Sequence, residues 1–322
     1  MKPPYDITAE ILHLVSSISG RLGEVKARYL EKPNPPQRQQ SRIRTIHSSL
    51  KIEGNTLTQE QITALLNGKR ILGPPKDITE ALNAVRAYEQ LSNYKPFSAK
   101  SFLTAHRILM EGLITHPGQY RTEAVGIMTG SKVTHVAPPA ANVKFLMADL
   151  FEYLEKDVEI LLIKSCVFHY ETEFIHPFID GNGRMGRLWQ AVLLRKMSSV
   201  FEYLPFETAI LQNQDAYYQA LSQSDNTGNS TVFIEYMLKV IDQALTEFLD
   251  KSGRVLTQKE RLVHFLSQQS REFTRKDYLE VFKELSTATA SRDLKAGVEE
   301  GFFEKTGEKR NAVYRPSKAS TL

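Results

Sequence analysis

Most of the chain carries apolar residues three or four positions apart, the spacing that places them on one face of an α-helix. Proline and glycine clusters interrupt this pattern, for example at residues 33–36 and 73–75. The pattern predicts helices over residues 6–30, 40–52, 58–67, 77–95, 99–112, 141–155, 157–174, 212–223 and 230–249. The fold class is therefore expected to be mainly α.

One stretch before residue 250 departs from the helical spacing. Residues 120–139 alternate between apolar and polar positions, with β-branched residues around Gly130-Ser131. Alternation of this kind is typical of a β-strand, and glycine between two such runs is typical of a turn. The stretch is therefore predicted to form a β-hairpin within a helical domain.

A different order of elements follows the short linker at residues 251–254. Helices are predicted over residues 257–268 and 274–284, and a third after Ser286, which suits the N-cap position. Residues 301–315 then read as two short strands around a charged turn, and three helices followed by a hairpin resemble a winged helix. The predicted domains are an N-terminal helical segment, a core domain and a winged-helix domain, over residues 1–74, 75–250 and 255–318.

The composition is that of a globular protein. With 322 residues, 41% of them hydrophobic, the chain is long enough for a full core and for more than one domain. The single cysteine, Cys166, lies on an apolar helical face, so no disulfide framework exists and a reducing compartment fits. The N-terminus has only a short apolar run, and no run approaches the roughly 20 apolar residues of a membrane span. We expect a soluble cytoplasmic protein with no membrane partner.

Residues 176–187, His-Pro-Phe-Ile-Asp-Gly-Asn-Gly-Arg-Met-Gly-Arg, concentrate polar chemistry in a loop after the helix predicted at 157–174. Leu188, Trp189, Val192 and Leu193 have helical spacing, so a second helix is predicted to follow, with the last loop residues already in it. An imidazole with an ordinary pKa of about 6.5 takes a proton from a hydroxyl near neutral pH, which suits His176 as a base. Asp180 offers the hard oxygen that fits Mg²⁺. Free amides at a helix start suit an anion, and Arg184 and Arg187 share a helical face that suits successive phosphates. Because such a set forms no core, we interpret the loop as a nucleotide phosphate site.

The pattern His-Pro-Phe-x-Asp-Gly-Asn-Gly-Arg-x-x-Arg resembles the signature of the Fic family, matched here without a gap. The resemblance extends over about residues 40–250 and implies a Fic-type helical core with a β-hairpin flap. Fic proteins are mostly protein adenylyltransferases, which move AMP from ATP to a Ser, Thr or Tyr hydroxyl of a target or of themselves. Members that transfer the γ-phosphate carry a lysine at the position of Gly183, so this glycine favours AMP transfer.

The resemblance also implies a role for each residue of the site. His176 would deprotonate the target hydroxyl, Asp180 would hold Mg²⁺, and Arg184 and Arg187 would hold the outer phosphates. The flap would cover the nucleotide and receive the protein target as an added strand. The residues implied to bind the nucleotide are Ser131, Lys132, Val133, Thr134, Gly181, Asn182, Gly183, Arg184, Met185, Gly186 and Arg187, with Tyr217, Tyr218 and Asp225 near the adenine.

Ser49-Leu-Lys-Ile-Glu53-Gly54, at the end of a predicted helix, resembles the inhibitory motif of Fic proteins, Ser/Thr-x-x-x-Glu-Gly/Asn. The motif implies that Glu53 pairs with Arg187, so that the guanidinium cannot hold the γ-phosphate. ATP would then bind with its α-phosphorus badly placed for attack. Some relatives use this glutamate to position a water that removes AMP, and that second activity stays open.

The predicted winged helix leaves a further alternative open, a nucleotide-sensing transcriptional regulator. Residues 251–322 hold 15 Lys and Arg against 10 Asp and Glu. This basic excess suits DNA phosphates, with the third helix in the major groove. The glutamates of this region would oppose a phosphate backbone, so protein contacts are an equal alternative. The donor nucleotide, and a homodimeric state, are left open as well.

Overall fold

The structure is a computed structural model that describes residues 2–29, 35–129, 132–251, 258–269, 271–282, 285–307 and 312–317. The chain divides into two compact units, Met1–Asp250 and Lys251–Leu322. One hydrophobic core runs through the first unit and joins the segments predicted as residues 1–74 and 75–250. In the part of the chain that the structure describes, no helix is long and apolar enough to cross a membrane.

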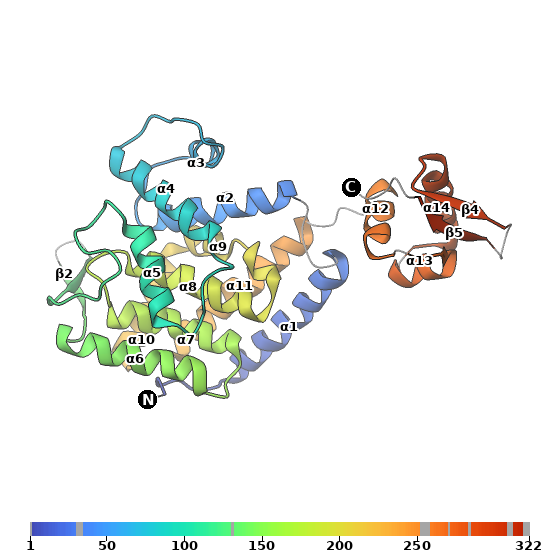
Figure 1. Ribbon diagram of the computed structural model, residues 1–322. Helices are drawn as coiled ribbons and strands as arrows, with labels where there is room; N and C mark the ends of the chain where they lie inside the picture. The colour runs from blue at the N-terminus through green and yellow to red at the C-terminus, as the bar shows by residue number, and fades with distance from the viewer. Residues whose placement is uncertain are drawn as a thin grey trace. The chain divides into compact units, whose positions relative to one another are not determined.

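Among the described residues of the first unit, all regular elements are helices except one hairpin, which confirms the predicted fold class (Figure 1). The hairpin consists of β1 (Gly126–Thr129) and β2 (Lys132–Val136), which pair antiparallel. The helices are α1 (Ala9–Tyr29), α2 (Pro35–Ile52), α3 (Gln59–Leu66), α4 (Pro75–Glu89), α5 (Ala99–Met110), α6 (Ala140–Lys156), α7 (Leu161–Ile175), α8 (Asn182–Met197), the 3₁₀ helix η1 (Ser199–Glu202), α9 (Phe206–Gln212), α10 (Gln214–Thr227) and α11 (Thr231–Lys251).

Two details of the first unit differ from the sequence pattern. α2 begins at Pro35, inside the stretch predicted as a loop, because proline fits the first turn of a helix, where no amide donor is needed. η1 and α9 were not predicted, since a helical repeat is not visible in four and seven residues.

α7 and α8 form the centre of the first unit, with other helices around them (Figure 1). Both carry buried residues on all sides, as expected for helices inside a core. An aromatic cluster packs between them and α5: the ring of Phe102 lies 5.1 Å from Trp189 and 5.4 Å from Phe178. This cluster fixes the α7–α8 connection, which is the predicted site loop.

α2 packs against α4, α8 and α9. It ends where the inhibitory motif was predicted: Gly54 has φ +86° and its N–H donates to the Lys51 carbonyl at 3.0 Å. Glycine adopts such a left-handed conformation without steric cost, so the helix terminates there. Ser49 and Glu53 thereby lie against α8, where both side chains contact Arg187.

The second unit has its own small hydrophobic core, centred on Phe265, Phe273 and Phe303. Its elements are α12 (Gln258–Gln268), β3 (Phe273–Thr274), α13 (Arg275–Val281), α14 (Thr287–Glu299), β4 (Phe303–Thr306) and β5 (Val313–Pro316). The strands form one antiparallel sheet in the order β3-β5-β4, of which β3 was too short to be predicted. Ser286 caps α14, as expected, by accepting from the Thr289 N–H at 3.1 Å.

Candidate active site

The loop between α7 and α8 has a fixed shape. α7 ends at His176 in a left-handed conformation, φ 50° and ψ 59°, which residues other than glycine rarely adopt. The Asn182 side chain accepts from the Phe178 N–H and donates to the Phe178 carbonyl, each at 2.9 Å. Phe178 is fully buried, as its apolar character predicts. The loop is therefore anchored on both sides of Asp180.

His106, on α5, supports the same loop from inside the core. Its ring stacks on Phe178 with centroids 3.6 Å apart. Its Nδ1 accepts from the Gly118 N–H at 2.9 Å, so Nε2 carries the proton and donates to the Asp180 carbonyl at 3.0 Å. Burial lowers the pKa of His106 to about 4, which keeps the ring neutral. His106 thus positions Asp180, a role that the sequence did not suggest.

The ring of His176 is oriented by its own helix. Nδ1 lies 3.3 Å from the Glu173 carbonyl oxygen. Because a carbonyl only accepts, Nδ1 must carry the proton, and Nε2 then has the lone pair. This tautomer gives His176 the form that a general base needs.

The start of α8 has the features of an anion site. The first amide to donate within the helix is that of Met185, to the Gly181 carbonyl at 2.9 Å. The N–H groups of residues 182–184 therefore have no intrahelical acceptor, and they carry the positive end of the helix dipole. A Cβ atom at Gly183 would lie 2.5 Å from Glu53 Oε1, so the Glu53 carboxylate occupies the space above this turn.

Arg187 is fully buried and paired with α2. Its Nη2 donates to Glu53 Oε1 at 2.7 Å and to the Ser49 carbonyl at 3.1 Å, and its Nε donates to Ser49 Oγ at 3.2 Å. The structure thus brings together the three residues of the predicted inhibitory contact. The effect of this contact on nucleotide binding stays a prediction.

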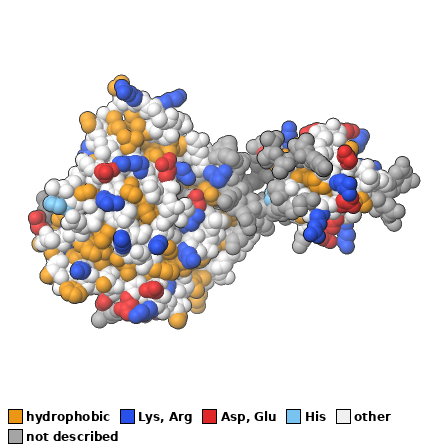
Figure 2. Space-filling view, in the orientation of Figure 1, with side chains coloured by type: hydrophobic (Ala, Val, Ile, Leu, Met, Phe, Trp, Pro, Cys, Tyr) orange, Lys and Arg blue, Asp and Glu red, His pale blue; other side chains and the backbone are white. Residues whose placement is uncertain are grey.

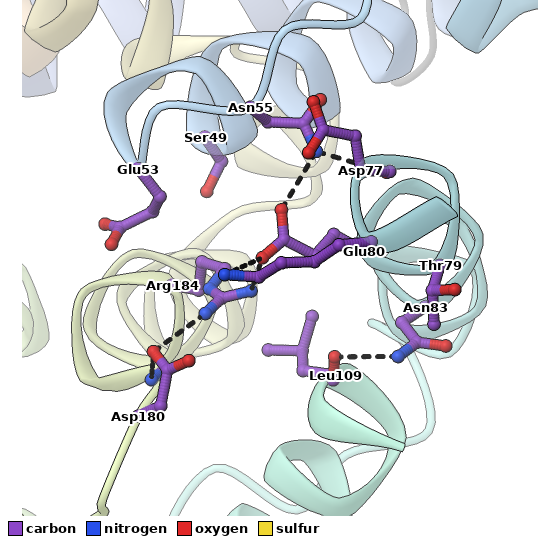
Figure 3. A network of polar contacts seen from close by, with 12 residues as sticks. Ser49, Glu53, Asn55, Asp77, Thr79, Glu80, Asn83, Leu109, Asp180 and Arg184 are labelled. Carbon is purple, nitrogen blue, oxygen red and sulfur yellow. Dashed lines mark hydrogen bonds and ion pairs between the residues drawn. The ribbon is translucent and has the colours of Figure 1, made fainter. Parts of the chain in front are cut away.

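Arg184 is held by two carboxylates, as Figure 3 shows. Its Nη2 donates to Asp180 Oδ1 at 3.0 Å, and its Nη1 donates to Glu80 Oε1 at 3.2 Å. Glu80 lies on α4 and was not predicted as part of the site. Each signature arginine therefore pairs with a carboxylate outside the signature: Arg187 with Glu53, just after α2, and Arg184 with Glu80 on α4.

Glu173, His169, Gln190 and Tyr217 form a largely buried polar cluster at α8. The carboxylate of Glu173 accepts from the Tyr217 hydroxyl at 3.3 Å. Burial and the Glu53 carboxylate raise the pKa of Glu173 to about 7, against the opposing effect of Arg187. His169 bonds Gln190 at 2.7 Å and Tyr217 at 3.1 Å, and burial lowers its pKa to about 3. His169 is therefore a neutral, fully buried side chain with a packing role.

Arg121 connects the hairpin to the loop. Its guanidinium donates to four backbone carbonyls, those of His176 at 2.7 Å, Glu123 at 2.8 Å, Pro138 at 2.5 Å and Ile175 at 3.3 Å. Glu123 and Pro138 flank the two strands of the hairpin, so one buried side chain ties both ends of the flap to His176. No local sequence signal indicated this residue.

The remaining predicted nucleotide contacts are placed as follows. Ser131 lies outside the described residues, and Lys132, Val133 and Thr134 belong to β2, of which the backbone alone is described. Tyr217 is buried, Tyr218 is 49% exposed, and Asp225 accepts from the Tyr170 hydroxyl at 3.0 Å. Gly186 lies within α8 against His169, where a Cβ atom would come within 2.6 Å of that ring.

Met185 does not fit the predicted contact with nucleotide. Its side chain is fully buried in the core, and its N–H is taken by Gly181. The helix turns this position away from the loop, because it follows Arg184 by one residue, about 100° around the axis. We assign Met185 to packing.

Asp180 fits a magnesium ion bound by one carboxylate. Its side chain is 46% exposed at the start of the phosphate-binding turn. Among the described residues, no three His, Cys, Asp or Glu side chains gather as a metal site. Mg²⁺ is often held by one or two carboxylates together with phosphates and water, so a single exposed aspartate suits it.

Comparisons with known proteins agree with this geometry. The Fic/DOC family profile matches residues 96–194, which contain the loop. The crystal structure of a Fic family protein from Desulfovibrio desulfuricans G20 is 39% identical, superimposes with a TM-score of 0.76, and matches over 99% of both chains. A helical fold with this loop defines the Fic class, and the chain belongs to the Fic family.

Curated relatives match this chain over only part of their own length. Protein adenylyltransferase Fic from Nematostella vectensis is 28% identical over 221 residues, 63% of this chain and 48% of that protein. Protein adenylyltransferase fic-1 from Caenorhabditis briggsae is 26% identical over 232 residues, 67% of this chain and 43% of that protein. The chain thus spans less than half the length of these two relatives.

Proposed function

We propose that the chain is a protein adenylyltransferase, which moves AMP from ATP to a Ser, Thr or Tyr hydroxyl of a protein, itself included. One observation carries the proposal. His176 has its lone pair on Nε2, and the same loop leads into a helix start with two arginines and with amides that have no acceptor within the helix. The imidazole suits proton removal and the helix start suits phosphates. The names of the Nematostella and Caenorhabditis relatives support the same reaction.

In the proposed reaction, the target hydroxyl oxygen attacks the α-phosphorus of ATP, and His176 Nε2 takes the hydroxyl proton. A bond forms between that oxygen and the α-phosphorus. The bond from the α-phosphorus to the oxygen that bridges to the β-phosphate breaks, and pyrophosphate leaves with the electron pair. Arg184 and Arg187 hold the departing phosphates, where charge develops.

Asp180 would hold the magnesium ion that accompanies ATP. When bound, the ion supplies positive charge that offsets the charge of the triphosphate. The same carboxylate bonds Arg184 at 3.0 Å and the Gly181 N–H at 2.6 Å. Asp180 therefore also fixes the positions of the arginine and the turn that bind phosphate.

Glu53 would keep this reaction slow. Its carboxylate neutralises Arg187 at 2.7 Å and lies over Gly183, where the phosphates would enter. The outer phosphates would then lack one guanidinium, and the α-phosphorus would lose its alignment with the incoming hydroxyl. Removal of this carboxylate is therefore expected to raise AMP transfer.

The β1–β2 hairpin would receive the target. Its strands form a two-stranded sheet, and a target segment would add to an edge through main-chain hydrogen bonds. Arg121 fixes the base of this hairpin to His176, which supports the proposal that a segment docked there reaches the base.

Labelled nucleotides test the proposed reaction. Glu53→Gly protein is incubated with Mg-ATP that carries the label on either the α- or the γ-phosphate. We expect stable label on the protein from the α-position only. Label from the γ-position would mean phosphate transfer, and no label from either would contradict transferase activity. A panel with GTP and UTP decides the donor, and loss of the α-label on wild-type protein would reveal AMP removal.

A second candidate function is DNA binding by the C-terminal unit, which we interpret as a winged helix. Arg292 and Lys295 are exposed on α14, and Arg275 bonds Ser291 on the same side at 3.0 Å. Acidic and basic side chains are both visible on this unit (Figure 2). A gel shift with the full chain tests DNA binding, because phosphate contacts weaken as salt rises. Arg292→Ala/Lys295→Ala should abolish a shift made by this face, and no shift at low salt would exclude DNA.

A further inference from the structure

Glu80 is a buried carboxylate outside the signature that accepts hydrogen bonds from two buried side chains of different function, besides an ion pair with the exposed Lys76 at 3.9 Å. Only 7% of the residue is exposed. Its Oε1 accepts from Arg184 Nη1 at 3.2 Å, and its Oε2 accepts from Asn55 Nδ2 at 2.9 Å. Figure 3 shows the carboxylate between Asn55 and Arg184, with Asp180 on the other side of the guanidinium. Glu80 thus links Asn55, two residues after Glu53, to Arg184 of the proposed phosphate site.

The hydrogen bond to Glu80 orients the guanidinium of Arg184. Arg184 is 5% exposed, and among the described residues its Nε has no hydrogen-bond partner. A guanidinium is a planar fork, so a bond from Nη1 to Glu80 fixes where Nη2 and Nε point. If a magnesium ion takes Asp180, Glu80 remains to hold the fork in place.

The other side of the link holds the loop after Glu53. Asn55 is 3% exposed, and its Nδ2 also donates to the Asp77 carbonyl at 3.1 Å. The adjacent Thr56 donates from both its N–H and its hydroxyl to Asp77 Oδ2, at 2.8 and 2.5 Å. These bonds fasten the end of α2 to the first turn of α4, so they hold Glu53 in reach of Arg187.

α4 itself is a rigid support. Asn83, one turn after Glu80, donates to the carbonyls of Leu109 at 3.0 Å and Glu111 at 2.8 Å, at the end of α5. A carboxylate on such a fixed helix needs little reorganisation to hold an arginine.

We propose that Glu80 is a positioning residue with two effects: one oxygen orients Arg184 for the outer phosphates of the nucleotide, and the other holds, through Asn55, the loop that keeps Glu53 on Arg187. The proposal rests on the proposed function. It also runs against simple electrostatics, because a carboxylate near a triphosphate repels it. If repulsion were the larger effect, removal of the charge would tighten ATP binding.

The test of the arginine side uses binding alone, which does not depend on AMP transfer. Affinities of ATP, ADP and AMP are measured for the full chain with Glu53→Gly, alone and with Glu80→Gln. We expect Glu80→Gln to weaken the affinity for ATP and ADP on the order of tenfold, comparable to the loss of a residue that orients a ligand at a metal site. The affinity for AMP should stay unchanged. Glu89→Gln, on the exposed end of the same helix, is the control.

Two results would overturn this side of the proposal. Equal weakening of all three nucleotides would indicate a general structural defect, and unchanged or tighter ATP binding would show that Arg184 needs no orientation. A double-mutant cycle adds a check: with Arg184→Met present, Glu80→Gln should have no further effect on ATP affinity.

The loop side is tested by Asn55→Ala, which leaves Arg184 and Glu80 in place. In the wild-type chain this substitution should raise AMP transfer severalfold, and in the Glu53→Gly chain it should change nothing. If Asn55→Ala alone transfers AMP at the same rate as wild type, with Tm showing that the variant is folded, the role of Asn55 is contradicted. If Glu53→Gly transfers no AMP at all, the proposed function fails, while the nucleotide affinities still decide the role of Glu80.

Discussion

Arg187 Nη2 lies 2.7 Å from Glu53 Oε1, although 134 residues separate them in the sequence. The arginine is fully buried, whereas the side chain of the glutamate is 29% exposed. A buried guanidinium needs a counter-charge, because its desolvation is costly without one. The contact therefore stabilises the fold while it occupies the arginine that the proposed reaction needs. In the proposed reaction, a triphosphate would replace the carboxylate as counter-charge.

Glu53→Gly should lower stability without nucleotide and regain it with nucleotide. Breaking a fully buried pair costs about 3–5 kcal/mol, and partial exposure of Glu53 reduces this to roughly 1–2 kcal/mol. Thermal unfolding with and without ATP measures both effects. A variant as stable as wild type without ATP would show that Arg187 does not depend on Glu53.

His176→Ala should abolish AMP transfer and leave ATP affinity within about twofold, because the phosphate contacts lie on α8 rather than on His176. Transfer and equilibrium binding are measured on the same preparation, in the Glu53→Gly chain. Retained transfer would refute His176 as the base.

Arg121→Met should impair the reaction but not nucleotide binding. Four backbone bonds would be lost, including the one to the His176 carbonyl, and the base would shift relative to the target. A misplacement of about 1 Å costs on the order of a hundredfold in rate, so we expect kcat to fall by about that factor with ATP affinity retained. Arg107→Met, at an exposed position of α5, is the control. Equal loss of ATP affinity would indicate that Arg121 supports the whole fold instead.

Glu173 should make stability depend on pH. Its pKa is raised to about 7 in the folded chain, above the ordinary value of 4.5. The protonated form is therefore favoured by folding, and this contribution is complete below about pH 4.5 and lost as pH rises to about 7. Glu173→Gln should reduce this pH dependence, to which Glu171 and Glu207 also contribute because burial raises their pKa values to about 7. It should stabilise the chain at pH 8 by on the order of 2 kcal/mol. Urea unfolding at pH 5.5 and 8 measures it, with the exposed Glu155→Gln as control. A parallel loss of stability in both chains would exclude Glu173 as the cause.

The loop at residues 176–187 was visible in the sequence because its chemistry is contiguous. The helices were predictable because apolar spacing decides which face is buried, and the family assignment is confirmed. Glu80 and Arg121 were not predictable, since a single charged residue on a helix or before a strand normally reads as solvent-exposed. Only the packing of α4 against the loop, and the approach of backbone carbonyls, gives them partners. The burial of Met185 could not be read from the signature, because neighbouring residues point about 100° apart around a helix, so one can face the loop while the next packs in the core.

The central claim is that the α8 entrance seats a triphosphate beside His176 and that Glu53 restrains it. Intact mass spectrometry after incubation with Mg-ATP tests it most directly, with wild type, Glu53→Gly and Glu53→Gly/His176→Ala compared in parallel. We expect added AMP on Glu53→Gly, much less on wild type, and none on the double variant. Equal modification of wild type and Glu53→Gly, or modification that survives loss of His176, would contradict it.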